Sequence, residues 1–399
     1  MTRLSLAIVV KDEEESLPRC LESVQGIVDE MVVLDTGSSD RTVEIAKDLG
    51  AKVEFFEWVD DFAIARNYGL EFVTGEWVLV LDADEVLVPE AVEPLLSAIA
   101  DPDNLVVNLI RQEVGAVQSP YSLVSRVFRN HPDVKFTRPY HSLVDDTVAE
   151  LQAKEPHWKI ADLPQVGMLH YGYSPKAIAA LNKTERAKRA MEKFYNEHPT
   201  DPYVCAKLGA IYLQLDRREE GLKLLETGLI NADKNPHLIY ELNYHLGNAY
   251  RSQDPNGAVN YYQMALKQKL LPPLKLGAYN NLGSLLVAGQ EHEMAVQAYD
   301  QVLKIDPTFA IGYYNKGLAL RGIGDFKGAI AAYQKTIELV PDYPWAYQNW
   351  GVALLKLGQV DESYEKFERA ITLHDAQNNP QEAQRLRDGL RSMGWKGNV

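Results

Sequence analysis

Trp77-Val78-Leu79-Val80-Leu81-Asp82-Ala83-Asp84-Glu85 places two aspartates directly behind a run of five apolar residues. Such a run is typical of a buried strand that ends in a turn. In an open α/β sheet, ligands bind beyond the carboxyl ends of the strands. An Asp-x-Asp turn alone is weak evidence for a site, since aspartate also caps helices. The surrounding sequence therefore decides what this turn does.

Short apolar runs alternate with amphipathic segments through the first half of the chain. We expect strands at 4–10, 30–34, 53–56, 77–81 and 105–110, and helices at 14–24, 40–49, 61–73 and 89–100. This alternation predicts βαβ crossovers and a Rossmann-like, mostly parallel α/β sheet. Asp35 ends the second strand, so the sheet brings it to the same edge as Asp82 and Asp84.

No glycine-rich phosphate loop accompanies these strands. The chain contains neither G-x-x-x-x-G-K-[ST] nor G-x-G-x-x-G, so a bound nucleotide diphosphate would have no glycine cradle. The other solution is a divalent cation that carboxylates hold against the phosphate oxygens. We therefore predict a Mn²⁺ or Mg²⁺ site at Asp84 and Asp82.

From about residue 200 the sequence repeats. Glycines recur with spacings of 38, 36, 34 and 34 residues, at Gly209, Gly247, Gly283, Gly317 and Gly351. In the last three units a small residue follows twelve positions later and an aromatic residue four beyond it: Ala295 and Tyr299, Ala329 and Tyr333, Ser363 and Phe367. This pattern resembles the tetratricopeptide repeat, and it predicts an all-α superhelix of about five units.

Four segments follow from these patterns. We expect the α/β domain at 1–174, a basic linker helix at 175–198, the repeats at 199–375, and a capping helix and tail at 376–399. The linker carries six lysines and arginines in an otherwise acidic chain. A solvated helix face explains them more simply than a phosphate contact does.

Composition narrows the function and the compartment. A net charge of −15 argues against a nucleic-acid partner, and two distant cysteines argue against a disulfide framework. The apolar run at 4–10 is too short for a signal peptide and is followed by acids. No stretch approaches the roughly twenty apolar residues of a membrane span. We expect a cytoplasmic protein.

Four motifs in this order and spacing resemble family 2 glycosyltransferases, which have the GT-A fold. The motifs are Leu6-Ala7-Ile8-Val9-Val10-Lys11-Asp12-Glu13, Val33-Leu34-Asp35-Thr36-Gly37-Ser38-Ser39-Asp40-Arg41-Thr42, Ala65-Arg66-Asn67 and Asp82-Ala83-Asp84-Glu85. More narrowly, the chain is similar to a bacterial branch joined to tetratricopeptide repeats, which includes lipopolysaccharide-core and peptide S-glycosyltransferases. The resemblance implies metal-dependent, inverting transfer of a hexosyl-type sugar from a nucleotide sugar, for which we expect a UDP-sugar. It implies a peptide, protein or glycan acceptor.

The resemblance also implies roles for residues that bind the donor. Glu13 and Asp35 would contact the ribose and base of the nucleotide, although Glu13 also fits a solvated helix terminus. Arg66 would pair with the diphosphate or base, because a planar guanidinium suits such oxygens. The alternative for Arg66 is a surface ion pair with Asp60 or Asp61.

The same resemblance assigns the metal site. Asp84 would be the principal ligand, and Asp82 would contact the ribose or the metal. His170, within Met168-Leu169-His170-Tyr171-Gly172-Tyr173, would complete the site, although a lone histidine is more often structural.

The general base stays open. Inverting transfer needs a base that deprotonates the acceptor, and a thiol acceptor would need less help. Relatives often carry a His-Glu pair where this chain has His141 and Ser142, so one candidate carboxylate is missing. The remaining candidates are Asp145, Asp146, Glu113 and His141.

Asn281, Asn315 and Asn349 occupy the same place in three successive repeats. Such a row would line the concave face and could bind an extended peptide backbone, as in the similar repeats of O-GlcNAc transferase. The alternative is a common consensus residue in an array used for homodimer formation or as a scaffold. Loss of catalysis would leave a scaffold protein. A nucleotidyltransferase is less well supported, because no basic triphosphate-binding signature lies near the N-terminus.

Overall fold

The computed structural model describes residues 3–394 except 117, 139–141, 173–184, 186, 187 and 190. The chain forms two compact units, 1–242 and 243–399. The first holds the α/β domain and the first helix pair of the repeats. The boundary falls inside helix α9 (Pro236–Tyr250). Among the described residues, no helix has both the length and the apolar character needed to cross a bilayer.

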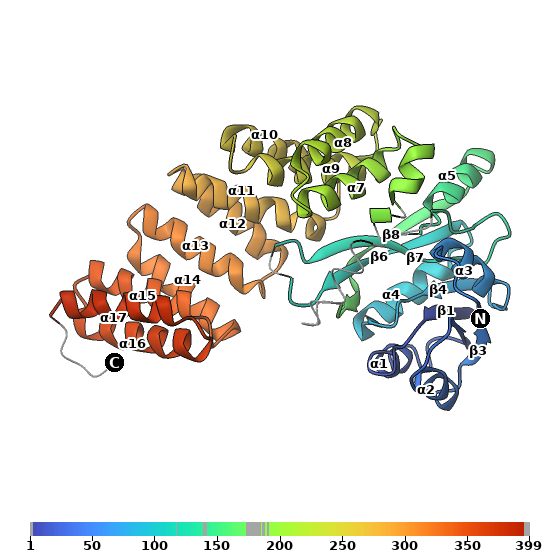
Figure 1. Ribbon diagram of the computed structural model, residues 1–399, viewed down its shortest axis with the longest axis horizontal. Coiled ribbons are helices and arrows are strands. Elements are labelled where there is room, and N and C mark those ends of the chain that lie inside the picture. The colour runs from blue at the N-terminus through green and yellow to red at the C-terminus, as the bar shows by residue number, and fades with distance from the viewer. Residues whose placement is uncertain are drawn as a thin grey trace. The chain divides into compact units, whose positions relative to one another are not determined.

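One eight-stranded sheet organises the first unit (Figure 1), in the order β3-β2-β1-β4-β7-β6-β8-β5. Its strands are β1 (Leu4–Val10), β2 (Glu30–Asp35), β3 (Lys52–Phe55), β4 (Trp77–Val80), β5 (Glu85–Leu87), β6 (Asn104–Glu113), β7 (Tyr121–Arg129) and β8 (Lys159–His170). The half made of β1 to β4 is parallel, which confirms the α/β prediction. β7 runs antiparallel to β4 and β6, and β5 runs antiparallel to β8, so the whole sheet is mixed.

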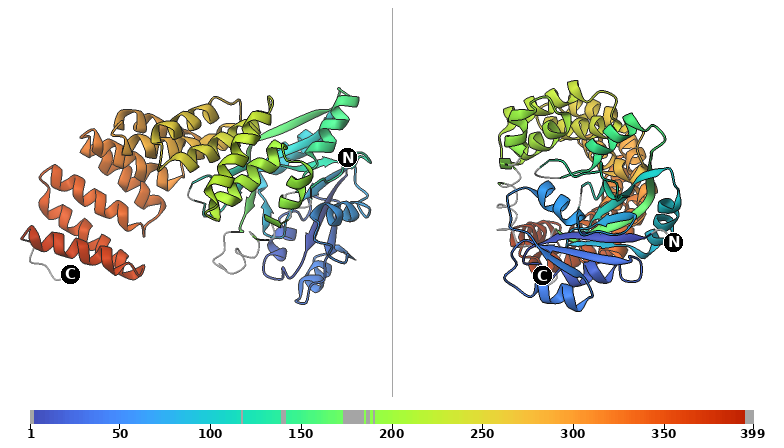
Figure 2. Two further views of the ribbon diagram at one scale, coloured as in Figure 1. Left: turned by 45° about the horizontal axis from the view of Figure 1, so that its top comes forward. Right: turned by 90° about the vertical axis from the view of Figure 1, so that its right-hand side faces the viewer.

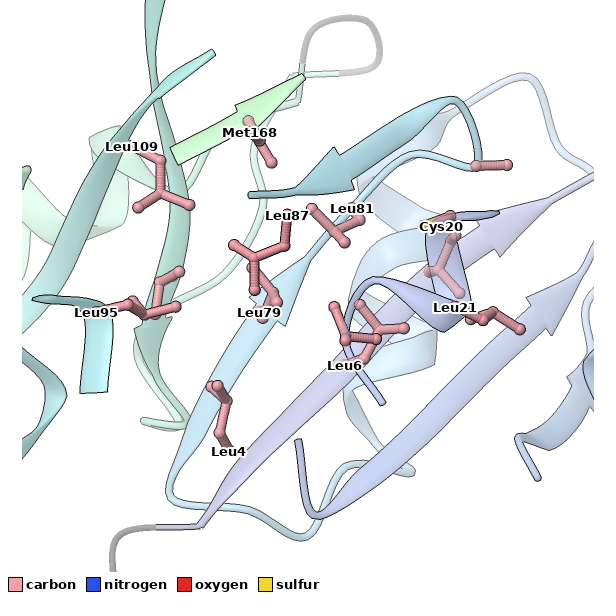
Figure 3. Packing of buried hydrophobic residues seen from close by; sticks show 14 of the residues in the cluster. Leu4, Leu6, Cys20, Leu21, Leu79, Leu81, Leu87, Leu95, Leu109 and Met168 are labelled. Atoms are coloured by element: carbon pink, nitrogen blue, oxygen red, sulfur yellow. The ribbon is translucent and has the colours of Figure 1, made fainter. Parts of the chain in front are cut away.

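Helices cover both faces of this sheet. They are α1 (Leu17–Glu22), α2 (Thr42–Asp48), α3 (Phe62–Leu70), α4 (Pro89–Ala100) and α5 (Asp145–Lys154). Because side chains alternate along a strand, Leu6 of β1 packs in the cluster of α1 and α4, whereas Ala7 packs in the cluster of α3 and α5. Figure 3 shows Leu6 near Leu79 and Leu21 in the first cluster. Two buried faces explain the continuously apolar strands.

The repeats form antiparallel helix pairs, as predicted. The pairs are α7 (Pro202–Gln214) with α8 (Arg218–Asn231), α9 with α10 (Pro255–Leu266), α11 (Leu276–Ala288) with α12 (His292–Ile305), α13 (Ala310–Gly322) with α14 (Phe326–Leu339), and α15 (Pro344–Lys356) with α16 (Val360–Ala376). A short 3-10 helix (Pro272–Lys275) precedes α11, and α17 (Pro380–Ser392) follows the last pair. Pairs of the second unit follow one another in chain order (Figure 2).

The repeat glycines let two helices approach closely. A Cβ added at Gly283 would lie 2.7 Å from the ring of Tyr299, and one added at Gly351 would lie 3.0 Å from the ring of Phe367. The aromatic residues seen in the sequence pattern therefore pack against the glycines of the same unit.

The predicted linker helix is described only in part. Lys176, Lys183 and Arg186 lie outside the described residues. Met191 is buried and packs with Val204 of α7, so the end of this helix is attached to the first helix pair. The division into four segments stays a prediction.

Candidate active site

Asp35 lies at the carboxyl end of β2 and is only 2% exposed. Its carboxylate accepts the backbone N–H groups of Gly37, at 3.0 Å, and Ser38, at 3.1 Å. Gly37 has a φ of 99°, a conformation that favours glycine. These bonds fix the turn after β2. A carboxylate has about four acceptor positions, so it can still accept a ligand hydroxyl.

The loop that follows β1 is fastened to this turn. Asp12, with a φ of 53°, accepts the backbone N–H of Ser39 at 2.7 Å. The backbone N–H of Glu13 donates to the Thr42 hydroxyl at 2.8 Å, and the Glu13 carboxylate accepts the Ser16 hydroxyl. Glu13, in the loop after β1, and Asp35, at the end of β2, thus lie at the same edge of the sheet.

Two arginines hold Asp82. Nη2 of Arg66 donates to Oδ1 of Asp82 at 2.8 Å, and Nη2 of Arg126 donates to Oδ2 at 2.5 Å. Burial alone would raise the pKa of Asp82, but the two guanidinium groups outweigh it and hold that pKa well below its usual range. Asp82 is therefore ionised, and both of its oxygens are engaged.

Arg66 does not make the alternative surface ion pair. Asp61 caps α3 by accepting the backbone N–H of Ala63 at 2.8 Å, and Asp60 accepts the indole N–H of Trp58 at 2.8 Å. The guanidinium of Arg66 instead reaches the strand ends.

A fully buried carboxylate lies behind the Asp82 pair. Glu85 is 0% exposed, and it accepts Arg126 at 3.0 Å and Arg111 at 3.1 Å. Its other oxygen accepts the backbone N–H of Asp82 at 2.9 Å. Arg126 and Arg111 were not among the residues predicted from the sequence. The available signal was a charge inside an apolar run, because Arg126 interrupts Leu123-Val124-Ser125-Arg126-Val127-Phe128.

Asp84, His170 and Glu113 form a second group at this edge. Nε2 of His170 lies 3.2 Å from Oδ2 of Asp84, and Nδ1 of His170 bonds the Glu113 carboxylate. Burial would lower the pKa of His170, but the bonds to Asp84 and Glu113 outweigh it and raise that pKa to about 9. Arg111 binds the other oxygen of Glu113 at 2.9 Å.

This group fits a divalent cation. A carboxylate oxygen and an imidazole nitrogen lie side by side, and the other ring nitrogen bonds a carboxylate, as in many metal sites. In the described part of the chain, no three or more His, Cys, Asp or Glu side chains form a cage for a metal ion. Mg²⁺ commonly takes only one or two protein carboxylates and completes its shell with phosphate and water. Asp84 and His170 provide a small number of protein ligands of this kind.

A cavity lies beside α3. It is lined mainly by apolar side chains, among them Ile8, Leu34, Leu70 and Phe136, with Arg66 at one side. Such a lining offers little to a charged diphosphate, so we place the site at the strand ends.

Comparison with known proteins settles the family. Residues 5–160 match Glycosyl transferase family 2, and residues 283–324 and 319–358 match the TPR repeat. The chain is 42% identical to a TPR repeat-containing protein of Synechococcus elongatus, over 99% of this chain and 98% of that protein. The chain belongs to the family 2 glycosyltransferases joined to tetratricopeptide repeats.

Other relatives match parts of this glycosyltransferase. The SPbeta prophage-derived glycosyltransferase SunS of Bacillus subtilis is 29% identical, over 58% of this chain and 54% of SunS. An uncharacterized glycosyltransferase of Rickettsia typhi is 40% identical over 23% of this chain and 30% of its own length. Among solved structures, YrrB, a TPR protein with an unusual peptide-binding site, matches 50% of this chain and 100% of its own, with 17% identity and a TM-score of 0.42.

The candidate bases of the glycosyltransferase differ in their surroundings. Asp146 is paired with Arg138, whose Nε and Nη2 donate to it at 2.9 Å and 3.0 Å. Asp145 is exposed and accepts the hydroxyl of Ser125 at 3.1 Å. Glu113 is engaged by His170, as described above. His141 lies outside the described residues.

The repeat asparagines bond to neighbouring helices. Asn281 is buried and donates to Oδ1 of Asn248 at 2.9 Å, and Asn315 donates to Oδ1 of Asn280 at 3.0 Å. Asn349, also buried, donates to the hydroxyl of Tyr314 at 3.1 Å and accepts Arg321 at 2.8 Å. These amides connect successive repeats. Peptide binding by them stays a prediction, and it would compete with these bonds.

Proposed function

We propose that this glycosyltransferase transfers a sugar from a nucleotide-diphosphate donor, which we expect to be a UDP-sugar, to a peptide, protein or glycan acceptor. The observation that carries the proposal is the position of Asp84 beside His170, with Glu113 behind the imidazole. Family membership indicates the class of reaction. A cation held by Asp84 and His170 would allow the protein to bind a diphosphate without a glycine-rich loop.

Mn²⁺ or Mg²⁺ bound by Asp84 and His170 would neutralise the charge of the departing diphosphate. Glu113 bonds Nδ1 of His170 and so holds the ring with Nε2 toward Asp84. Protonated His170 cannot ligate a cation, so metal binding requires loss of the ring proton.

Asp82 has a different role in this proposal. Arg66 and Arg126 keep it ionised and fixed, while 41% of its side chain stays exposed. An exposed and ionised carboxylate edge suits the ribose hydroxyls of the donor better than it suits a second metal bond. We assign the nucleoside to Asp82, Asp35 and Glu13, with Arg66 beside the diphosphate.

The acceptor base is assigned by the state of each carboxylate. Arg138 pairs with Asp146 and holds the pKa of that carboxyl low despite its burial. A carboxylate of lowered pKa is a weak base. Asp145 is exposed and accepts the hydroxyl of Ser125. Asp145 is therefore the stronger candidate for the base that deprotonates a hydroxyl acceptor.

Donor hydrolysis tests this proposal. Purified protein would be incubated with Mn²⁺ and a panel of nucleotide sugars, and released nucleoside diphosphate quantified. We expect turnover of one donor that EDTA abolishes and that Asp84→Asn lowers by about 100-fold or more, as for loss of one transition-state contact. Asp103→Asn, at an exposed pair with Lys159, should retain full turnover.

A non-catalytic scaffold is the alternative, and one observation favours it. Ser142 stands where relatives often carry a glutamate, and it is buried and accepts Arg66 at 3.1 Å. If the protein neither turned over nor bound any nucleotide sugar of the panel, a scaffold function would replace the transferase function.

A further inference from the structure

Arg138 has an unusual conformation and an unusually complete set of partners. Its φ is 73°, a left-handed conformation that costs free energy for a residue with a side chain. Its guanidinium binds both oxygens of Asp201, at 3.2 Å and 3.1 Å, in addition to Asp146. It also lies over the rings of Tyr203, at 4.5 Å, and Phe194, at 5.5 Å. These contacts of the guanidinium offset the cost of the backbone conformation.

These partners come from two parts of the first unit. Asp146 lies in the first turn of α5, in the transferase domain. Asp201 is the N-cap of α7, the first repeat helix, and also accepts the backbone N–H of Val204 at 2.9 Å. Arg138 therefore joins the transferase domain to the first repeat through partly buried, charge-assisted hydrogen bonds.

A continuous set of contacts leads from Arg138 to the donor site. The neighbouring Thr137 pairs with Leu143, with backbone N–H···O distances of 2.8 Å and 3.2 Å. Ser142, next to Leu143, accepts Nη1 of Arg66 through its carbonyl oxygen and its hydroxyl, each at 3.1 Å. The other nitrogen of Arg66 holds Asp82, as described above.

We propose that Arg138 is a positioning residue for the donor: it ties the backbone pair of Thr137 and Leu143 to the first repeat and so sets the place of Arg66. The inference rests on the proposed function, and it makes the first repeat part of the enzyme. Small displacements of a substrate-binding group have large effects, up to about 100-fold for about 1 Å. Loss of the contacts of Arg138 should therefore weaken donor binding more than it lowers the turnover rate of the bound donor.

Three variants test the inference. Arg138→Met removes the charge, Arg138→Lys keeps the charge but loses the planar fork, and Asp201→Asn keeps a helix cap but loses the carboxylate. Lys159→Met, at the exposed pair with Asp103, is the matched control for loss of one cation. Each protein would be assayed for donor KM and kcat of hydrolysis, for UDP affinity with Mn²⁺, and for thermal unfolding.

We expect Arg138→Met and Asp201→Asn to raise the donor KM and the UDP Kd by about 10-fold, with kcat changed less, as for a displaced binding group. The donor KM and UDP Kd of Arg138→Lys should lie between those of these variants and those of the wild type. The double variant Arg138→Met/Asp201→Asn should have a donor KM and UDP Kd no higher than those of Arg138→Met, because the two residues act through one contact. Lys159→Met should match the wild type.

Folded variants with unchanged KM and Kd, and only a lower unfolding temperature, would overturn the inference and leave Arg138 a structural contact. If Arg138→Met does not fold, Asp201→Asn carries the test, because its helix cap is retained. A wild-type protein that neither binds UDP nor hydrolyses a donor would overturn the proposed function and this inference together. An active wild type with unaffected variants would overturn this inference alone.

Discussion

Nε2 of His170 lies 3.2 Å from Oδ2 of Asp84, although 86 residues separate them in the sequence. Strand pairing accounts for this. β5 pairs antiparallel with β8 and sets Glu85 opposite His170, and β6 pairs with β8 and sets Glu113 opposite His170. The candidate metal site is therefore built by the mixed half of the sheet, and the parallel half carries the loops to which we assign the nucleoside.

Gly172→Ala should damage this site without unfolding the protein. A Cβ there would lie 2.6 Å from Nε2 of His170 and 3.1 Å from Oδ2 of Asp84. The two ligands would have to separate, so we expect Mn²⁺ affinity and donor turnover to fall by about 10- to 100-fold. Calorimetric Mn²⁺ titration measures the first quantity.

The matched control for that variant is Gly389→Ala, in α17. A Cβ at Gly389 would meet no atom within 4 Å. It should leave Mn²⁺ binding unchanged and raise stability by up to about 1 kcal/mol, the helix propensity difference. Equal Mn²⁺ affinity in Gly172→Ala and the control would show that the His170–Asp84 contact is not the metal site.

Metal binding should depend on pH in one direction. The bonds to Asp84 and Glu113 raise the pKa of His170 to about 9, against an opposing effect of burial. Below that pH a metal ion must displace a proton, so apparent Mn²⁺ affinity should rise about tenfold per pH unit toward pH 9. In the metal-free protein the charged ring stabilises the fold fully below pH 6.5, its ordinary pKa, and this contribution disappears as the pH rises through about 9.

Mn²⁺ titration between pH 6.5 and 9.5 measures this dependence, with His170→Gln as the comparison. The variant should bind Mn²⁺ weakly and with a much flatter pH profile. A wild-type affinity that stays constant across this range would contradict the assignment of His170 as a ligand.

Arg126→Met should destabilise the transferase domain strongly. It removes a guanidinium from Asp82 and from Glu85, which is fully buried. Breaking a buried ion pair costs about 3–5 kcal/mol, and Arg66 and Arg111 retain part of the network, so we expect about 3 kcal/mol. Arg41→Met, at an exposed pair with Glu44, should cost far less, because solvent screens exposed ion pairs. Equal losses in urea unfolding would show that the buried network is unimportant for stability.

Gly283→Ala should destabilise the repeats. Its Cβ would lie 2.7 Å from the ring of Tyr299, and overpacking of this kind costs about 1–3 kcal/mol. Gly389→Ala again supplies the control for a helical glycine. Equal denaturation midpoints for the two variants would mean that the helices have room to separate at this position.

Local patterns predicted much of the fold. The predicted strand 4–10 and helix 89–100 coincide with β1 and α4, because a largely apolar run marks the strand and a proline at the first helical position marks the start of the helix. The predicted helix 14–24 is shorter, because α1 starts only at Leu17. β5, β7 and β8 were missed. β5 is three residues long and begins within the acidic turn.

Residues of the candidate site could be predicted from the sequence only where each follows directly on one predicted strand. Asp35, Asp82 and Asp84 follow apolar runs, so their location could be read locally. The engagement of Asp82 by Arg126 depends on β7 pairing with β4, and the bond between Glu113 and His170 depends on β6 pairing with β8. Such register is set by tertiary packing, which one sequence does not specify at this detail.

Calorimetric titration of UDP, with Mn²⁺ and then with EDTA, tests the central claim most directly. The proteins compared would be the wild type, Asp84→Asn and Asp145→Asn. A metal held by Asp84 and His170 predicts that UDP binds the wild type and Asp145→Asn only with Mn²⁺, and that Asp84→Asn loses about 100-fold or more in affinity. UDP binding that survives both EDTA and Asp84→Asn would contradict it.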